Sequence, residues 1–254
     1  LHQRGIIFMK VIILLIWRKR MNDVLYKGTI KGFPLIKFQN EEIINKTIGG
    51  SFYMNSLKHY RELYEMKGDE FIGDPCEGKI FISEKLDAQF IVPEKGIFQN
   101  LKDVAISTPS EDDFVFCMFS VNPQKNDEFR FTEEQREKII GIYDTALIIT
   151  DVYEYFKRIR KKALSEGIDI TGGFVKYYDE CIDTPQLFLN LMSGMEKVVY
   201  YKRKKYSIQQ EFRFTVPNPR KDMHFEFNIG DISDISVAMP SKDICNAIIT
   251  ERKD

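Results

Sequence analysis

Short apolar runs of strand length, separated by glycine and proline turns, constrain the fold of this chain more than any other feature. The run at 114–121 and the run at 146–150 are examples. At that length a buried strand is favoured over a helix. Helical segments are fewer and do not alternate regularly with the strands, which disfavours a doubly wound parallel sheet. The sequence therefore predicts an α+β fold with a mainly antiparallel or mixed sheet and a few flanking helices.

The other expected elements follow from local patterns and turn residues. Further strands are expected within 24–38, 49–57, 79–83, 89–92, 174–178, 197–201, 208–216, 224–227 and 235–239. Helices are expected at 57–66, 132–142 and 185–195, with the strongest after residue 151. In that last helix Asp151 is the N-cap, Glu154 is its capping-box partner, and Gly167 ends the helix.

Composition predicts one domain spanning residues 21–254. With 254 residues, 43% of them hydrophobic, the chain can bury a large single core, and no repeat or linker divides it. Residues 1–20 are interpreted as a non-domain N-terminal extension, with the natural start at Met21. The apolar stretch 5–17 is shorter than the ~20 residues of a membrane-spanning helix, and Lys10 interrupts it. A short interfacial anchor is the alternative.

Charge and cysteine usage exclude several classes of protein. The net charge of −1, from 37 basic and 38 acidic residues, gives no global field for nucleic acid or an anionic membrane. The four cysteines lie far apart with no CxxC spacing, so no zinc or other metal site is expected. We expect reduced thiols, no stable membrane span and a cytoplasmic location; the oligomeric state is left open.

The most informative segment is the expected strand at 208–216. Successive strand side chains point to opposite faces, so Gln209, Glu211 and Arg213 would share one face at spacings of about 7 Å. Such a row can orient a polar ligand or stabilise a cationic transition state. The alternative is a half-exposed strand in which Glu211 and Arg213 form only a surface ion pair.

Two further segments carry candidate binding residues. The stretch 200–206 is basic and aromatic, which suits phosphate or a nucleobase but is also typical of a solvated turn. In the helix at 57–66, Tyr60 and Arg61 lie on one side. Arg61 would either neutralise Asp69 or Glu77, or orient a phosphate beside the glycine-bearing loop 73–78.

The order of these segments resembles a broad group of bacterial proteins of unknown function associated with mobile elements and phage defence. The matching pieces are residues 25–27, 52–61, 73–78, 116–120, 175–177 and 206–213. The pair Gln209 and Glu211 also resembles the final motif of ADP-ribosyltransferases. That resemblance implies NAD as a substrate, a catalytic Glu211 and an acceptor-orienting Gln209. The superfamily's first-strand arginine or histidine has Lys27 as its nearest counterpart, and Ser56 or Ser120 stand in for its serine-rich strand.

The leading hypothesis is an ADP-ribosyltransferase-like toxin or phage-defence effector that acts on NAD and on a protein or nucleic-acid acceptor. In this reading Lys27, Tyr60, Arg61 and Arg213 would hold the dinucleotide. One alternative is a non-catalytic module that binds nucleic acid or a nucleotide through residues 200–206 and through the basic face of the helix after residue 151. Another is a metal-dependent nuclease using Asp69, Asp74, Glu77 and Glu211.

Overall fold

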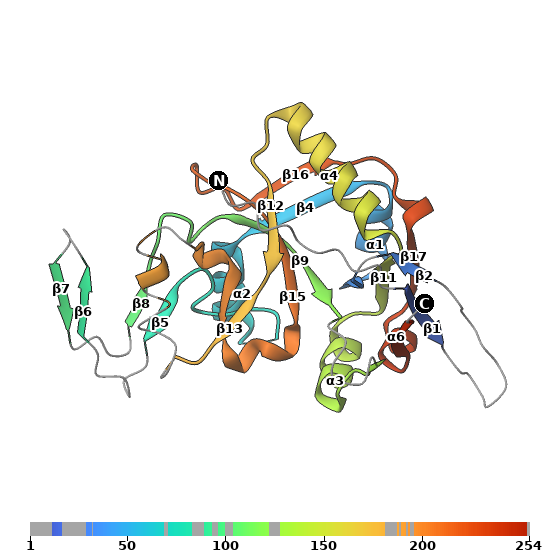
Figure 1. Ribbon diagram of the computed structural model, residues 1–254, viewed down its shortest axis with the longest axis horizontal. Helices are drawn as coiled ribbons and strands as arrows, with labels where there is room; N and C mark the ends of the chain where they lie inside the picture. The colour runs from blue at the N-terminus through green and yellow to red at the C-terminus, as the bar shows by residue number, and fades with distance from the viewer. Residues whose placement is uncertain are drawn as a thin grey trace. The chain divides into compact units, whose positions relative to one another are not determined.

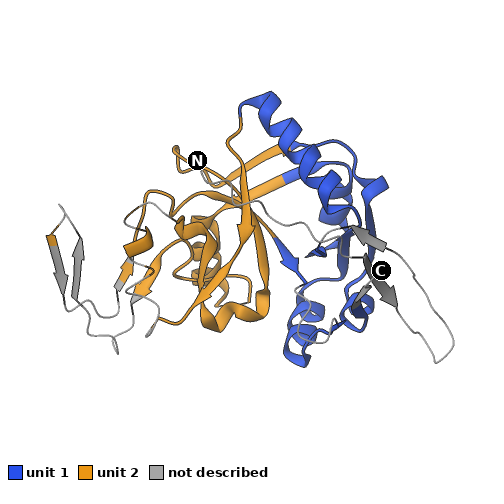
Figure 2. Ribbon diagram, viewed as in Figure 1, with its two compact units in different colours: residues 1–52, 118–167, 228–254 blue, residues 53–117, 168–227 orange. Residues whose placement is uncertain are grey.

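The chain forms two compact units, which the computed structural model describes separately (Figure 2). Unit 1 comprises residues 1–52, 118–167 and 228–254, and unit 2 comprises residues 53–117 and 168–227. The residues that the structure describes are 12–16, 29–31, 33–68, 71–82, 89–92, 96–99, 104–121, 128–180, 187, 189–191, 193 and 196–252. The expectation of one domain over residues 21–254 stays a prediction.

Unit 1 is built on antiparallel strands with β11 (Thr145–Ile149) between β3 (Leu35–Gln39) and β17 (Ser236–Pro240) (Figure 1). In this register Leu147 lies opposite both Lys37 and Ala238. The helices of unit 1 are α1 (Glu41–Ile48), α3 (Glu133–Ile142), α4 (Val152–Glu166) and α6 (Ser241–Cys245), with a 3₁₀ turn at Ser233–Ile235.

Local capping signals account for the helices that the sequence predicted in unit 1. The Asp151 side chain accepts the amide of Glu154, and Gly167 ends α4 in the left-handed conformation at φ 67°. The capping-box role of Glu154 is replaced by ion pairs of its carboxylate with Lys157 and Arg158. A capping box does form at the start of α3, where Thr132 and Gln135 bond reciprocally.

A second sheet in unit 1 contains part of the predicted N-terminal extension. Its strand order is β10 (Glu128–Phe129), β18 (Ile248–Arg252), β1 (Ile12–Ile16) and β2 (Thr29–Lys31). Strand β1 pairs antiparallel with both of its neighbours. The start at Met21 stays a prediction. Within the described residues, no helix is both long enough and apolar enough to cross a membrane.

In the part of unit 2 that the structure describes, helix α2 is combined with short strands and 3₁₀ turns. These elements are α2 (Leu57–Lys67), β5 (Ile80–Ile82), β6 (Gln89–Val92), β7 (Gly96–Gln99), β8 (Val104–Ile106), β12 (Thr171–Phe174), β13 (Lys176–Tyr178), η1 (Val198–Tyr200), β14 (Tyr201–Arg203), η2 (Lys204–Gln209) and β15 (Glu211–Val216). Strands β4 (Ser51–Ser56), β9 (Phe114–Ser120) and β16 (His224–Asn228) each contribute residues to both units.

Antiparallel pairing prevails among the described strands of unit 2, and β13 pairs with β14 in parallel. Helices beside a mainly antiparallel sheet confirm the predicted α+β class. Two expected strands are wrong in detail. Residues 198–200 form a 3₁₀ turn before β14, and the strand expected at 208–216 begins only at Glu211.

Candidate functional site

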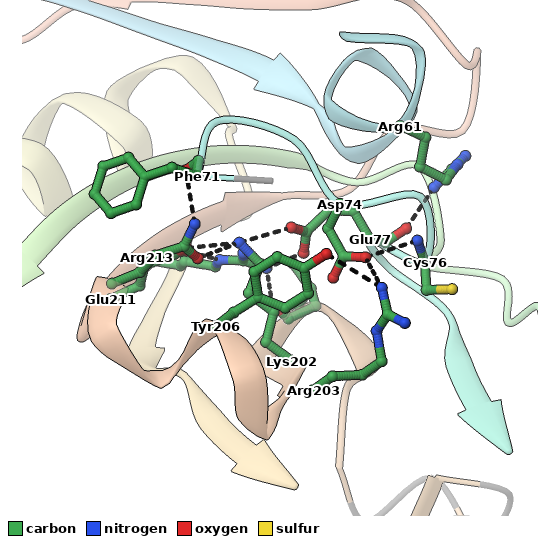
Figure 3. Close-up of polar contacts among 12 residues, drawn as sticks. Arg61, Phe71, Asp74, Cys76, Glu77, Lys202, Arg203, Tyr206, Glu211 and Arg213 are labelled. Carbon is green, nitrogen blue, oxygen red and sulfur yellow. Dashed lines mark hydrogen bonds and ion pairs between the residues drawn. The ribbon is translucent and has the colours of Figure 1, made fainter. Parts of the chain in front are cut away.

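Four charged side chains of unit 2 form a closed ring in which acids and bases alternate (Figure 3). The Lys202 ammonium lies 3.0 Å from Glu77 Oε2 and 2.8 Å from Glu211 Oε1. The Arg213 guanidinium closes the ring, with Nη1 2.8 Å from Glu77 Oε1 and Nε 2.6 Å from Glu211 Oε2. We call these four residues the charge ring.

Three separate chain segments bring the charge ring together. Glu211 and Arg213 are two residues apart on β15, so their side chains share a face. Lys202 is the central residue of β14. Glu77 lies in the loop between α2 and β5, where its amide donates to the carbonyl of Asp74 at 3.0 Å. All six residues of β15 are buried, so the expected half-exposed strand and surface ion pair are both wrong.

The loop that carries Glu77 requires its glycines. Gly78 has φ 72°, and a Cβ there would lie 2.5 Å from the carbonyl oxygen of Glu111. A Cβ on Gly73 would lie 2.7 Å from the amide nitrogen of Tyr64. Larger residues would therefore displace the loop from α2. The motif at 73–78 is thus a tight turn that holds one acid of the charge ring.

Burial and charge act in opposite directions on the ring. Burial raises the pKa of the Glu211 carboxyl, but Arg213 and Lys202 outweigh it and hold that pKa well below its usual range. Burial likewise lowers the pKa of Lys202, and the carboxylates of Glu211 and Glu77 outweigh it and raise that pKa. The Glu211 carboxylate and the Lys202 ammonium are therefore both charged at neutral pH.

Gln209 joins the charge ring through Lys202. Its Oε1 accepts from the Lys202 ammonium at 2.6 Å, and its Nε2 donates to the carbonyl of Phe71 at 2.8 Å. The expected strand pleat does not produce this arrangement, because Gln209 ends η2 and Gln210 is left-handed at φ 42°. Gln209 and Glu211 nevertheless contact the same ammonium, as the prediction of a shared site requires.

A second ion pair lies next to the ring in Figure 3. The Arg203 guanidinium donates to Asp74 Oδ1 at 2.7 Å and to the Tyr206 hydroxyl at 3.2 Å. It also lies 5.3 Å from the centre of the Phe81 ring. Lys202 and Arg203, the central cations of the basic stretch 200–206, are therefore buried and paired with acids. Its exposed cations are Lys204 and Lys205.

Arg61 is engaged within the protein, but with other partners than expected. Its Nη1 donates to the carbonyls of Glu77 and Glu111 at 2.7 and 2.8 Å, and its Nη2 pairs with the Asp112 carboxylate. The Glu77 carboxylate is instead paired with Lys202 and Arg213 in the charge ring. Asp69 lies outside the described residues. The guanidinium thus ties α2 to two loops.

Tyr60 is a predicted binding residue, and the charges of the ring affect the pKa of its hydroxyl. Burial raises the pKa of that hydroxyl, and among the weaker effects the nearby charges of Glu211 raise it and those of Arg213 lower it. Lys27 lies outside the described residues, so its role stays a prediction. Tyr177 lies in the segment 175–177 of the resemblance and was not predicted as a site residue; its hydroxyl accepts a hydrogen bond from the backbone amide of Glu211 at 2.9 Å.

Three of the four carboxylates of the metal-dependent alternative are paired with cationic side chains, and the fourth, Asp69, lies outside the described residues. Asp74 pairs with Arg203, and Glu77 and Glu211 pair with Lys202 and Arg213. Among the residues that the structure describes, no three His, Cys, Asp or Glu side chains are grouped as metal ligands.

The sequence grouped Glu77 with Glu211 only in the metal-dependent alternative, and it predicted Lys202 only as part of the basic stretch 200–206. Two signals were available: the glycine-bearing loop around Glu77 and the run of four cations between tyrosines at 200–206. Neither gives the partner, because 136 residues separate Glu77 from Arg213. No protein-family model, no curated protein and no solved structure matches this chain.

Proposed function

We propose that unit 2 is an ADP-ribosyltransferase-like catalytic unit that acts on NAD, with Glu211 as the catalytic residue and Gln209 orienting the acceptor. The observation that supports this most directly is the shared contact of Gln209 and Glu211 with one ammonium, at 2.6 and 2.8 Å. This contact places an amide and an ionised carboxylate side by side, as the resemblance to the final transferase motif requires.

Exposure distinguishes Glu211 from the other acid of the ring. Its side chain is 10% exposed, against 2% for Glu77, 5% for Lys202 and 1% for Arg213. Each carboxylate oxygen has two lone pairs, so one bond from Lys202 and one from Arg213 leave acceptor capacity for a ribose hydroxyl. Glu211 is therefore the ring member that we propose touches the substrate.

An ionised carboxylate suits the proposed chemistry. The bond between the nicotinamide nitrogen and C1′ of the ribose breaks, and its electron pair leaves with nicotinamide. Positive charge then develops on the sugar, which Glu211 would stabilise. The acceptor atom, from water or a macromolecule, bonds to C1′ and releases its proton to solvent water. Because Lys202 and Arg213 keep Glu211 charged, the site needs no proton removed before the reaction.

Two residues expected to hold the dinucleotide receive a different role in this proposal. Arg213 donates to Glu211, to Glu77 and to the carbonyl of Val199 at 2.8 Å, and its side chain is buried. Arg61 is bonded to two backbone carbonyls and Asp112. We therefore propose that both arginines position the loop and the catalytic glutamate, and that Tyr60 and Lys27 are the candidates for NAD contact.

The direct test measures nicotinamide release from NAD by the purified chain, with Glu211→Gln and Glu77→Gln as a matched pair. Both substitutions remove one negative charge from the same ring, so both reduce stability. We expect E211Q to lower the rate by about 100-fold or more per folded molecule. With E77Q, the loss should follow the folded fraction, measured by circular dichroism.

Labelled NAD added to a bacterial lysate tests the acceptor in the same series. Radioactivity in protein or in nucleic acid would identify the class of macromolecule, and its loss with E211Q would link it to this site. Absence of nicotinamide release from the folded wild-type chain would overturn the proposal. Equal losses per folded molecule with E211Q and E77Q would also overturn the assignment of Glu211.

A further inference from the structure

Lys202 occupies an unusual position in the candidate site, because its ammonium makes three close contacts with acceptors from three segments. These acceptors are Gln209 Oε1 at 2.6 Å, Glu211 Oε1 at 2.8 Å and Glu77 Oε2 at 3.0 Å. An ammonium group has three N–H donors, so these contacts match its full donor capacity. The side chain is 5% exposed, which leaves it little freedom to seek other partners.

We propose that Lys202 is a positioning residue for the reaction: its ammonium fixes the Gln209 amide and the Glu211 carboxylate in one relative orientation. This inference rests on the proposed function of Glu211 and extends it to a residue that would not itself touch the substrate.

The backbone alone does not give that orientation. Gln209 ends a 3₁₀ helix, Glu211 begins a strand, and the left-handed Gln210 lies between them. The two side chains therefore lack the fixed relation of alternate residues in one strand. Arg213 donates to Glu211, and its other hydrogen bonds go to Glu77 and to the carbonyl of Val199. Lys202 is the cation that contacts both members of the proposed catalytic pair.

The same contact contributes to the charge state of Glu211. Burial raises the pKa of its carboxyl, and Arg213 and Lys202 lower it by a larger amount. The titratable groups around Glu211 come from several elements of unit 2. They are Arg213 on its own strand, Lys202 on β14, Glu77 in the loop before β5, Tyr177 on β13 and Tyr60 on α2.

Lys202→Met and Glu77→Gln provide the test, because both disturb the ring but change its charge in opposite directions. K202M removes a cation beside Glu211, so the pKa of Glu211 should rise and the acid limb of the pH–rate profile should move to higher pH. E77Q removes a neighbouring anion, so the pKa of Glu211 should not rise and the acid limb should not move to higher pH. If Lys202 had a purely structural role, K202M and E77Q would shift the pH–rate profile in the same direction, or neither would shift it.

The kinetic expectation is a split between turnover and substrate binding. We expect K202M to reduce kcat by about tenfold to 100-fold per folded molecule, because the pair loses its alignment. The KM for NAD should change much less, since Lys202 does not contact the substrate. If K202M fails to fold, Lys202→Gln replaces it, because a neutral amide can still donate within the ring and the same shifts are expected.

Titration of side-chain carboxyls by ¹³C NMR gives a measurement that does not depend on turnover, with the Glu211 signal assigned by its loss in E211Q. A higher Glu211 pKa in K202M and an unchanged or lower one in E77Q would support the inference. An unshifted Glu211 pKa in K202M, or an unchanged kcat, would overturn it. A wild-type chain that releases no nicotinamide would remove the proposed function, and the catalytic role of Lys202 with it, whatever the titration shows.

Discussion

At the scale of single residues, the charge ring is a set of paired charges. Its contribution to stability depends on the presence of all four groups. Two acids and two bases are buried together, with ion-pair distances of 2.6–3.0 Å. Desolvating such groups costs free energy, and the mutual attraction offsets that cost only while each charge has its partners. A single neutral substitution therefore leaves an uncompensated charge in the core of unit 2.

We predict that E77Q and K202M each lower the free energy of unfolding by about 3–5 kcal/mol, and that the double variant loses clearly less than their sum. Removing both groups leaves Glu211 paired with Arg213, so the remaining charges balance. Urea unfolding of the four proteins in a double-mutant cycle measures the coupling, expected to be about 1–3 kcal/mol. Additive losses would show that the four charges do not act as one ring.

Acid should weaken the wild-type protein partly through Glu211. Its pKa is depressed in the folded chain, so its contribution is fully present above the unfolded value of about 4.3 and is lost as pH falls through the folded value. The stability difference between wild type and E211Q should thus be constant at neutral pH and shrink below about pH 4. Urea unfolding at a series of pH values measures this difference; a constant gap down to the acid transition would contradict it.

At the scale of elements, the junction between η2 and β15 separates what the sequence could reveal from what it could not. Helix α4 was predictable because its signals are local: Asp151 caps it and Gly167 ends it. The pattern 208–216 alternates as a strand does, yet its first residues turn as a 3₁₀ helix. Alternation reports which side chains are apolar, but not where a left-handed residue interrupts the strand.

Substitutions at Gln210 test this junction. A left-handed conformation costs a residue with a Cβ about 1–2 kcal/mol, and glycine avoids that cost. We predict that Gln210→Gly unfolds at a urea concentration equal to or above that of the wild type, whereas the β-branched Gln210→Val unfolds earlier. If the two variants are equally stable, Gln210 is not held left-handed in solution.

At the scale of the whole molecule, the class of fold was predictable and the composition of the site was not. Many short apolar runs and few helices are global properties, and they gave the α+β class correctly. The charge ring instead depends on pairings between residues far apart in the chain, such as Glu77 and Arg213. For each charged residue the sequence offers many possible partners of opposite charge. Only the fold determines which of them it pairs with.

Because every member of the ring comes from unit 2, disruption of the ring should destabilise that unit first. We predict that amide hydrogen exchange in K202M accelerates about tenfold or more in β14, in β15 and in the loop 71–79, since these segments share the ring. Helix α4 belongs to unit 1 and has its own caps, so it serves as a reference within the same molecule. Equal acceleration in α4 would contradict this prediction, because it would mean that loss of the ring destabilises both units together.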